Sequence, residues 1–239
     1  MPADLTIVIP ARNEAAMLPR LLQSLLLQDI ADLPETRIIL ADAGSTDGTT
    51  QLALSFGDRL SIEVTHGGLP AVGRNAGARL ATTPFVLFLD ADVELRDCTL
   101  LRRALVTIRN RQLHLVTVSI ACRHGNLLDD TLYLGSNTMQ RISSFLKPFA
   151  TGMFMLFDRQ SFLSLGGFNE RALFAEDYLL SKRVATDRFC IVRGKVFTTN
   201  RRFRKIGHSR MVWMFFRTML HSWDEAYFLR DHDYWREAL

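Results

Sequence analysis

Short apolar runs alternate with amphipathic stretches over the first half of the chain. The apolar runs are typical of buried strands, and the stretches between them repeat apolar residues every three or four positions, as helices do. The pattern predicts strands at residues 5–9, 37–41, 61–65, 85–89 and 115–121, and helices at 15–27, 69–80 and 99–110, with a further helix capped by Ser45 or Thr46 and ending near residue 56. Repeated strand–helix–strand units imply an α/β fold with a doubly wound, mostly parallel sheet flanked by helices.

Beyond residue 125 the pattern is less regular. It predicts helices near 131–144, 160–165 and 177–186, a strand at 154–157, and a long apolar helix at about 211–229. On that last helix the charged residues share one side, and the other side is rich in aromatic residues. Two interpretations remain open. The apolar side covers the sheet or pairs two subunits in a homodimer, or it lies in the interface of a membrane.

Charge is unevenly distributed along the 239 residues. Nine Lys or Arg residues and no Asp or Glu lie between Arg188 and Trp223, although the net charge is only +4. Such a segment is either a solvated basic face or a patch for phosphates, those of a nucleotide or of anionic lipid. No recognised nucleic-acid-binding module is present, so nucleic acid is not an expected partner.

Cysteine usage and the lengths of the apolar runs indicate a cytoplasmic protein. The three cysteines form no CxxC pair, which fits a reducing compartment and disfavours disulfides and zinc. The first residues lack a basic region with a long apolar run, so no signal peptide is expected, and no run of 18 apolar residues predicts a transmembrane helix. The expected location is the cytoplasm, with peripheral contact at the cytoplasmic face of the membrane as an option.

Two carboxylates directly follow the apolar strand at 85–89. Asp90 and Asp92 would lie at the carboxyl end of a buried strand, where open α/β sheets bind ligands. Carboxylates in such a place are costly unless they are paired or bind a metal. Hard divalent cations such as Mg²⁺ take carboxylate oxygens and share substrate phosphates. The sequence therefore predicts a metal-assisted phosphate-ester site at this edge of the sheet.

Polar or glycine-rich segments also follow the first three strands. They are Arg12-Asn13-Glu14, Asp42 and His66-Gly67-Gly68. Because parallel strands end at one edge of a sheet, these segments predict one shared crevice. Asp42 is placed to accept hydrogen bonds from a base or a ribose, whereas the Ser, Thr and Asp that follow it are explained equally well as a turn and a helix cap.

The segment from Gly68 to Asn75 nearly matches a phosphate-binding P-loop. It lacks the Gly-Lys-Ser/Thr end of that motif, and Pro70 removes one backbone N–H donor, so a P-loop is excluded. Arg74 and the N-terminal amides of the next helix could still meet a diphosphate. The alternative is a glycine-rich turn with an exposed arginine.

Further candidates lie in the second half of the chain. Glu176 and Asp177 begin a predicted helix. Either the helix dipole favours acids in this first turn, as in many helices, or the two acids belong to a site. His208 could complete a metal site that few carboxylates hold, although a lone histidine is more often a packed or surface residue. Arg202 and Arg204 could clamp a leaving diphosphate.

In this order and spacing, these segments resemble the family 2 glycosyltransferases of the GT-A fold over about residues 5–183. The segments that carry the resemblance are residues 9–14, 42–49, 74–77, 88–92, 151–155, 166–170 and 176–177. The resemblance implies a GT-A-type domain at 1–205 and a C-terminal helical extension at 206–239. Within the domain it implies a nucleotide-sugar-binding half at about 1–122 and an acceptor half at about 123–205.

The resemblance also implies a mechanism and a set of residues. The donor would be a nucleotide-diphospho-sugar, with Mg²⁺ or Mn²⁺ held by Asp92, Asp90 and His208, and Asp177 of the family's Glu-Asp motif would be the base of an inverting transfer. The residues implied in donor binding are Pro10, Ala11, Arg12, Glu14, Asp42, Gly68, Arg74, Asn75, Asp90 and Ala91, together with Arg202 and Arg204. Many members carry two consecutive acids where this chain has Asp42-Ala43, so the nucleotide is not specified.

The acceptor would be a hydroxyl of a glycan or of a lipid-linked molecule. Two other functions remain open. A nucleotidyltransferase that makes the sugar nucleotide would have a glycine-rich, arginine-containing loop after the first strand, where residues 11–14 contain no glycine. A non-catalytic sugar-nucleotide-binding protein would have lost Asp177 or the Asp90/Asp92 pair, and all three are present.

Overall fold

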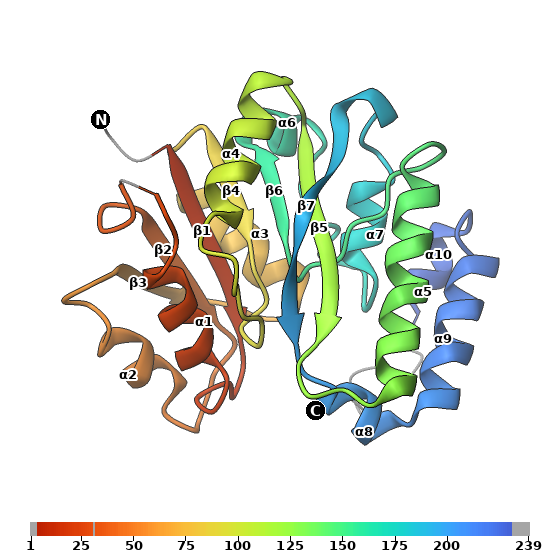
Figure 1. The fold of residues 1–239 in the computed structure, drawn as a ribbon, viewed down its shortest axis with the longest axis horizontal. Coiled ribbons are helices and arrows are strands. Elements are labelled where there is room, and N and C mark those ends of the chain that lie inside the picture. Colours follow the sequence, from red (N-terminus) through yellow and green to blue (C-terminus); the bar gives the residue numbers. More distant parts are fainter. Residues whose placement is uncertain (1–3, 31, 231–239) are drawn as a thin grey trace.

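The computed structural model describes residues 4–30 and 32–230 of the chain. Seven strands form one sheet in the order β3-β2-β1-β4-β6-β5-β7, with helices on both faces (Figure 1). The strands are β1 (Leu5–Ala11), β2 (Arg37–Asp42), β3 (Ser61–His66), β4 (Phe85–Phe88), β5 (Leu115–Cys122), β6 (Met155–Asp158) and β7 (Phe189–Thr198). All pair in parallel except β6, which runs antiparallel to β4 and β5. The prediction of a doubly wound, mostly parallel sheet is therefore confirmed.

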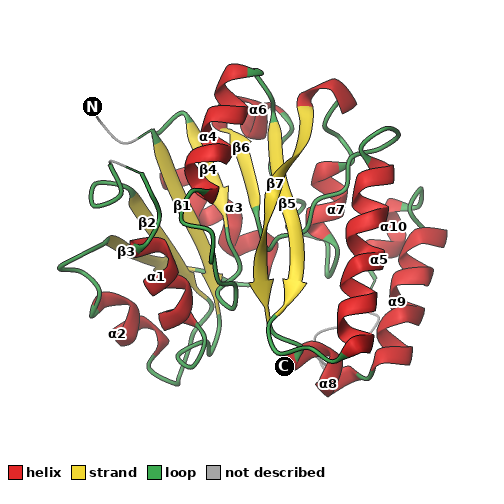
Figure 2. Cartoon of the chain, viewed as in Figure 1, coloured by secondary structure: helices red, strands yellow, loops and turns green. Residues whose placement is uncertain are grey.

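Helices cover both faces of this sheet (Figure 2). In chain order they are α1 (Leu18–Leu26), α2 (Thr49–Leu54), α3 (Pro70–Leu80), α4 (Leu100–Asn110), α5 (Leu127–Ser143), α6 (Arg159–Ser164), α7 (Glu176–Ser181), α8 (Arg201–Ile206), α9 (His208–Leu220) and α10 (Glu225–Phe228). A single 3₁₀ turn, Thr186–Arg188, precedes β7. In the described part of the chain, no helix is both long and apolar enough to cross a membrane.

The central strands read as unbroken apolar runs because both of their faces are buried. Ile7 of β1 packs with α1 and α4 on one face, and the next residue, Val8, packs with Phe88 and Phe162 on the other. Alternation along a strand sends neighbouring side chains to opposite faces, so each face needs its own apolar set. Gly77 of α3 lies so close to the sheet that an added Cβ would stand 2.3 Å from Val8 Cγ1, and this brings α3 down onto β1.

The predicted start of the second helix is wrong. Neither Ser45 nor Thr46 caps it: α2 begins at Thr49, after Gly48 in a left-handed conformation (φ 86°). The side chain of Ser45 instead donates to Asp42, and the backbone N–H of Thr46 donates to Asn13. These polar residues therefore shape the crevice rather than the helix.

The predicted long helix at 211–229 is also wrong. Helix α9 ends at Leu220, and α10 begins after Asp224, whose carboxylate accepts the Ala226 N–H at 3.0 Å. The break lets Tyr227 and Phe228 turn inward and pack against Phe174. A single straight helix could not bury this aromatic pair.

Two elements at the far edge of the sheet were not predicted, β7 and α8. Strand β7 lies at the edge and carries Arg193, Gly194 and Lys195 in its middle, where its pairing with β5 shifts register. This polar interruption hides the alternation that identifies strands. Helix α8 has only 6 residues, most of them basic, and it has no apolar stripe. Its sequence pattern therefore resembles that of a loop.

Candidate active site

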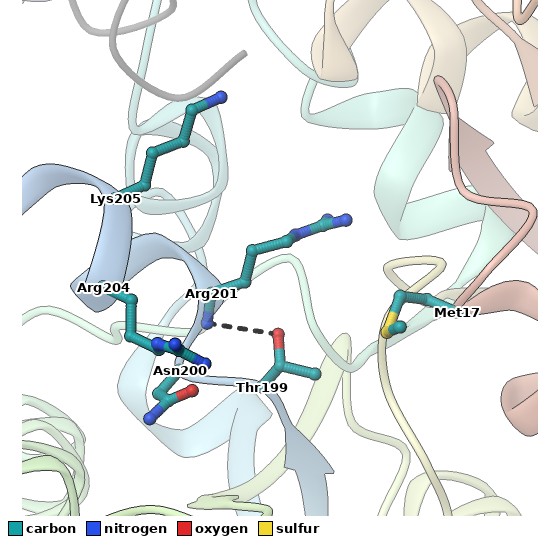
Figure 3. A pocket seen from close by; sticks show the side chains of 6 residues that line it. All are labelled: Met17, Thr199, Asn200, Arg201, Arg204 and Lys205. Atoms are coloured by element: carbon teal, nitrogen blue, oxygen red, sulfur yellow. Dashed lines mark hydrogen bonds between the residues drawn. The ribbon is translucent and has the colours of Figure 1, made fainter.

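A cleft opens at the carboxyl ends of the strands, between the loop after β1 and the start of α8. Its volume is about 510 Å³, and it is lined by Met17, Thr199, Asn200, Arg201, Arg204 and Lys205 (Figure 3). Met17 faces this basic group across the opening (Figure 3). The cleft thus has a basic wall that comes from the segment after β7, and Arg204 is the one lining residue that the sequence proposed for donor binding.

The loops after β1 and β2 are joined by side-chain-to-backbone hydrogen bonds. Ser45 Oγ accepts the Asn13 N–H at 2.9 Å, and Asn13 Oδ1 accepts the Thr46 N–H at 2.9 Å. The next two amides donate to the second loop as well, Glu14 N–H to Thr49 Oγ1 at 2.8 Å and Ala15 N–H to Asp47 Oδ2 at 3.0 Å. Asn13 adopts a left-handed conformation (φ 54°), which asparagine tolerates better than most residues. The two loops therefore form one rigid wall of the crevice.

Asp42 stands at the end of β2, as predicted, and the structure shows that it is half-buried. Both of its carboxylate oxygens accept from Ser45, one from the hydroxyl at 2.5 Å and one from the backbone N–H at 3.0 Å. Each carboxylate oxygen has a further lone pair, so contact with a base or a ribose is still available. On the neighbouring strand Pro10 is half-buried, Ala11 is buried and Arg12 is exposed.

Glu14 connects the two walls of the cleft. One of its carboxylate oxygens accepts from Arg201 of α8, and Oε2 is buried without a hydrogen-bond partner in the described part of the chain. Burial raises the pKa of Glu14, the Arg201 guanidinium opposes this rise, and the charges of Asp92 and Asp90 add to it. Three acids therefore share this side of the crevice.

Arg74 is buried at the centre of the site. Its guanidinium donates to Glu176 Oε1 at 2.5 Å and to Asp90 Oδ1 at 2.6 Å, and it lies 5.3 Å from the centre of the Phe168 ring. The side chain is only 3% exposed. The alternative interpretation of an exposed arginine is therefore wrong. Arg74 joins the end of β4 to the start of α7, because its two terminal nitrogens each donate to a carboxylate, Nη2 to Asp90 and Nη1 to Glu176.

Glu176 and Asp177 begin α7 as predicted, and they differ in their surroundings. Glu176 is buried against Arg74. Asp177 is half-buried, and its two oxygens accept the N–H groups of Gly152 at 2.8 Å and Tyr178 at 2.7 Å. Burial, together with the charge of Glu176, raises the pKa of Asp177 to about 6 against the opposing charge of Arg74. A carboxylate with this pKa is ionised at neutral pH and is more basic than an ordinary aspartate.

Asn75 has a structural role. Its amide nitrogen donates to the Phe168 carbonyl at 2.8 Å and to Glu170 Oε1 at 2.9 Å, and its oxygen accepts the Phe168 N–H at 3.0 Å. These bonds use the side chain to hold the 166–170 loop against α3. The prediction that Asn75 contacts a donor is therefore not supported by its surroundings.

The acids after β4 lie at the crevice, but His208 is held elsewhere. Asp92 Oδ2 accepts from the Thr198 hydroxyl at 3.2 Å, at the end of β7. His208 Nε2 lies 2.7 Å from Asp129 Oδ1, and its ring stacks on Phe203. No group of three or more His, Cys, Asp or Glu side chains able to hold a metal occurs among residues 4–30 and 32–230. His208 therefore joins α9 to α5 rather than completing a metal site with the two aspartates.

The remaining predicted residues are dispersed. Arg204 lines the cleft, Ala91 is buried between the two aspartates, and Gly68 is exposed just before α3. The side chain of Arg202 lies outside the described residues.

The sequence did not single out Arg201, Thr198 or Asp129. Arg201 belongs to the basic run, but nothing in that run marks it as the residue that reaches Glu14. Asp129 is the third residue of a capping box with Asn126, a spacing that is visible in the sequence. Its pairing with His208 joins positions 79 residues apart and has no local signal.

Gly152 is expected to be intolerant of substitution, because an added Cβ would lie 2.0 Å from Arg74 Nη2. Gly152→Ala should displace the buried guanidinium and lower the melting temperature and the activity together. The matched control is Gly135→Ala in α5, where a Cβ meets nothing within 4 Å and helix propensity favours alanine. Equal melting temperatures for the two variants, measured by circular dichroism, would contradict this account of Gly152.

Comparisons with known proteins agree with this arrangement. The model of the family "Glycosyl transferase family 2" matches residues 6–166. The chain is 42% identical over 93 residues to validoxylamine A glucosyltransferase of Streptomyces hygroscopicus subsp. jinggangensis, a match covering 37% of this chain and 22% of that protein. It is 38% identical over 104 residues to a PGL/p-HBAD biosynthesis glycosyltransferase of Mycobacterium bovis, covering 41% of this chain and 39% of that one.

Solved structures of two glycosyltransferases share the fold. S. aureus TarS in complex with UDP-GlcNAc superposes with a TM-score of 0.65 at 21% identity, over 82% of this chain and 58% of the other. The mannosyltransferase PcManGT from Pyrobaculum calidifontis, in complex with GDP-Man and Mn²⁺, superposes with a TM-score of 0.69 at 19% identity, over 90% and 61%. The sheet and its helices are thus those of the GT-A glycosyltransferases, and the family model covers about two thirds of the sequence. The chain belongs to glycosyl transferase family 2.

Proposed function

We propose that this protein transfers a sugar from a nucleotide-diphospho-sugar to an acceptor hydroxyl with inversion at the anomeric carbon, and that Asp177 is the base. The observation that carries the proposal is the setting of Asp177. It is a half-buried carboxylate at the start of α7, fixed by two backbone N–H groups, with its pKa raised to about 6. A base in this position can take the proton of the attacking hydroxyl as the new glycosidic bond forms.

The fixed orientation of Asp177 supports a single displacement. Two backbone donors from different segments hold the carboxylate, so its direction does not depend on a flexible side-chain partner. Arg74 stabilises the neighbouring Glu176 as an anion without contacting Asp177 directly, and this leaves Asp177 as the carboxylate free to accept a proton. One base acting on one face of the sugar corresponds to inversion.

The donor would occupy the cleft between the joined loops and the start of α8. Arg201 and Arg204 provide guanidinium groups that suit diphosphate oxygens. Asp42 at the end of β2 would contact the base or ribose through its free lone pairs. The related structures hold UDP-GlcNAc in TarS and GDP-Man in PcManGT, so both pyrimidine and purine nucleotides are candidates.

A divalent cation fits the acids of the crevice. Mg²⁺ is commonly held by one or two carboxylates together with substrate phosphates, so a cluster of three protein ligands is not required. Asp92 would be a protein ligand of the cation, because it follows the end of β4 and its carboxylate lies beside Thr198 at the end of β7. A bound cation would offset the negative charge that develops on the leaving diphosphate. The buried free oxygen of Glu14 lies on the same side and adds negative potential there.

Asp92→Asn is expected to abolish cation-dependent donor binding, because the neutral amide no longer offers a charged oxygen to the cation. Isothermal titration of the sugar nucleotide with Mn²⁺, with Mg²⁺ and with EDTA measures this. The melting temperature of the variant, measured in parallel, separates loss of the cation from loss of the fold. Asp187→Asn, an exposed acid of the 3₁₀ turn, is the control. Wild-type affinity in EDTA, or in the Asp92 variant, would contradict a cation at this site.

The proposed function is tested with a panel of UDP-, GDP- and dTDP-sugars, with and without Mn²⁺. Binding is measured first. Hydrolysis or transfer is then monitored through the release of the nucleoside diphosphate. Release of pyrophosphate would identify a nucleotidyltransferase instead. Binding without turnover on any acceptor would identify a non-catalytic sugar-nucleotide-binding protein. A product with retained anomeric configuration would contradict the role of Asp177.

A further inference from the structure

Helix α9 presents its apolar side to solvent. Its exposed residues are Val212, Trp213, Phe215, Phe216, Met219 and Leu220, and Trp223 follows just after its end. Trp213 is 56% exposed and Trp223 is 79% exposed. Placed 100° apart, these residues fall within about 160° of the helix circumference, and the buried Met211 lies outside this arc. The interpretation in which this side covers the sheet is therefore wrong, since the aromatic side faces outward.

Helix α5 shows the same inversion of the usual pattern. Its exposed apolar residues are Leu127, Leu128, Leu134, Met139 and Ile142, with Phe145 and Leu146 just beyond its end. They fall within about 140° of the circumference, and the two buried side chains of the helix, Asp129 and Gln140, are polar and lie opposite. Phe145 at the tip is 84% exposed. A helix with polar residues inside and apolar residues outside needs something apolar to cover it.

Helices α5 and α9 are joined to each other near their starts, and the segments that follow them both contact residues of α7 or the residue just after it. Their first turns are joined by the bond between His208 of α9 and Asp129 of α5. Their far ends both contact α7: Phe149, after α5, packs on Tyr178, and the Ser222 carbonyl, after α9, lies 3.4 Å from Lys182 Nζ. Figure 1 shows α5 and α9 standing side by side at the β5–β7 end of the molecule. The exposed ends thus flank the short helix that carries Asp177.

Basic residues border these apolar surfaces, with exposed acids at their margins, Asp130 in the first turn of α5 and Asp224 and Glu225 after α9. The segment from 188 to 223 has no acid, and neither does the segment from 131 to 157, which contains Arg141 and Lys147. Both of these side chains are exposed, as are Arg204 and Lys205 near the cleft. Aromatic and aliphatic residues beside Lys and Arg are the composition of helices that lie in the headgroup region of an anionic membrane.

We propose that the exposed sides of α5 and α9 rest on an anionic lipid surface, and that the acceptor hydroxyl is carried by a lipid of that surface and reaches Asp177 between their ends. The contact with lipid stands on the surface itself, whereas the identity of the acceptor rests on the proposed transfer reaction. Apolar side chains would enter the headgroup layer, and the surrounding Lys and Arg would pair with lipid phosphates.

A second copy of the chain is a poorer occupant. A two-fold symmetric contact places the same surface on both subunits, so the two acid-free basic segments would face each other. Like charges set opposite each other across an interface are unfavourable. An anionic lipid surface does not repel these basic segments, and each Lys or Arg adds to the attraction between the protein and the lipid.

The test is sedimentation of the full chain with vesicles at low salt, without any sugar nucleotide. We expect binding to phosphatidylcholine vesicles that contain phosphatidylglycerol, and weak binding to phosphatidylcholine alone or at high salt. Leu220→Ser should lower the partition coefficient at least about fivefold, because one large apolar side chain no longer enters the lipid. Leu54→Ser on α2 is the matched control, since Leu54 is 51% exposed and Leu220 is 55% exposed. Lys147→Glu should weaken binding to the anionic vesicles only.

Three results would overturn the proposal. They are no binding to anionic vesicles at low salt, equal binding by the Leu220 and Leu54 variants, and a dimer in sedimentation velocity that Leu220→Ser dissociates while vesicles capture nothing. Circular dichroism of each variant confirms that the fold is kept, as expected for exposed positions. Because vesicle binding is measured without a donor, a failure of the proposed transfer reaction would leave this result unchanged. With an active enzyme, transfer to a vesicle-borne acceptor should drop with Leu220→Ser and not with Leu54→Ser.

Discussion

Arg74→Met is expected to lower the free energy of unfolding by about 3–5 kcal/mol, the usual cost of leaving buried charges without their partner. The guanidinium is 3% exposed and is the shared partner of Asp90 and Glu176. Methionine fills a similar volume, so the change mainly removes charge and hydrogen bonds. Urea denaturation of both proteins measures the difference. Because the charge of Arg74 also holds down the pKa of Asp177, any remaining activity should need a higher pH.

The control for this variant lies five residues further along the same helix. Arg79 of α3 also pairs with an acid, Glu170, but it is 62% exposed. Arg79→Met should cost no more than about 1 kcal/mol, as is usual for surface ion pairs. If the two variants were equally stable, the buried pairing would not be the source of the effect. The double variant Arg74→Met with Glu176→Gln should recover part of the loss, because one buried charge is then removed.

Asp177→Asn is expected to lower kcat at least about 10²-fold, the lower end of the contribution of a positioned general base. The amide oxygen can still accept the Gly152 N–H, so the start of α7 should keep its geometry and the donor should bind with nearly unchanged affinity. The amide nitrogen cannot accept the Tyr178 N–H, but the removal of an unfavourably buried charge opposes this loss, so the melting temperature should change little. Parallel loss of donor affinity and kcat would instead place Asp177 in donor binding.

The pH profile of the same pair of proteins gives a second measurement. The proposed base, Asp177, could act only when it is ionised, and its pKa is raised to about 6 by burial and by the charge of Glu176. In the wild type kcat/KM should therefore fall as the pH drops through about 6 and should level off above it. This acidic limb should be missing in the residual activity of Asp177→Asn, and it should be unchanged in Asp187→Asn. A wild-type profile that is flat between pH 5 and 8 would contradict the assignment.

Much of the N-terminal half could be predicted because its signals are local. A short continuous apolar run such as 85–89, placed between helical patterns, favours a strand buried on both faces, and the acids after it then lie at a carboxyl edge. Asp90, Asp92, Asp42 and Glu14 all lie where this reasoning puts them. The start of α7 at Glu176 was likewise indicated by acids suited to a first turn.

What could not be predicted depends on contacts between distant segments. Nothing near Arg74 in the sequence distinguishes an exposed arginine from one buried between Asp90 and Glu176, because the second partner lies 102 positions away. The same holds for His208, whose partner Asp129 was hidden in a helix cap. The end of α9 at Leu220 was missed because the turn is set by the burial of Tyr227 and Phe228 rather than by a Gly or Pro.

The place of β6 in the sheet has a consequence for how the chain folds. Strands β1 to β4 are joined by local crossovers and can assemble as soon as they are synthesised. Their open edge is β4, and its partner β6 lies about 70 residues further along the chain. Until then a strand of four apolar residues has unpaired backbone groups, which is the kind of edge that recruits other chains. Fragments that end before residue 158 should therefore aggregate, and full-length chains should fold slowly because the central pairing spans so much sequence.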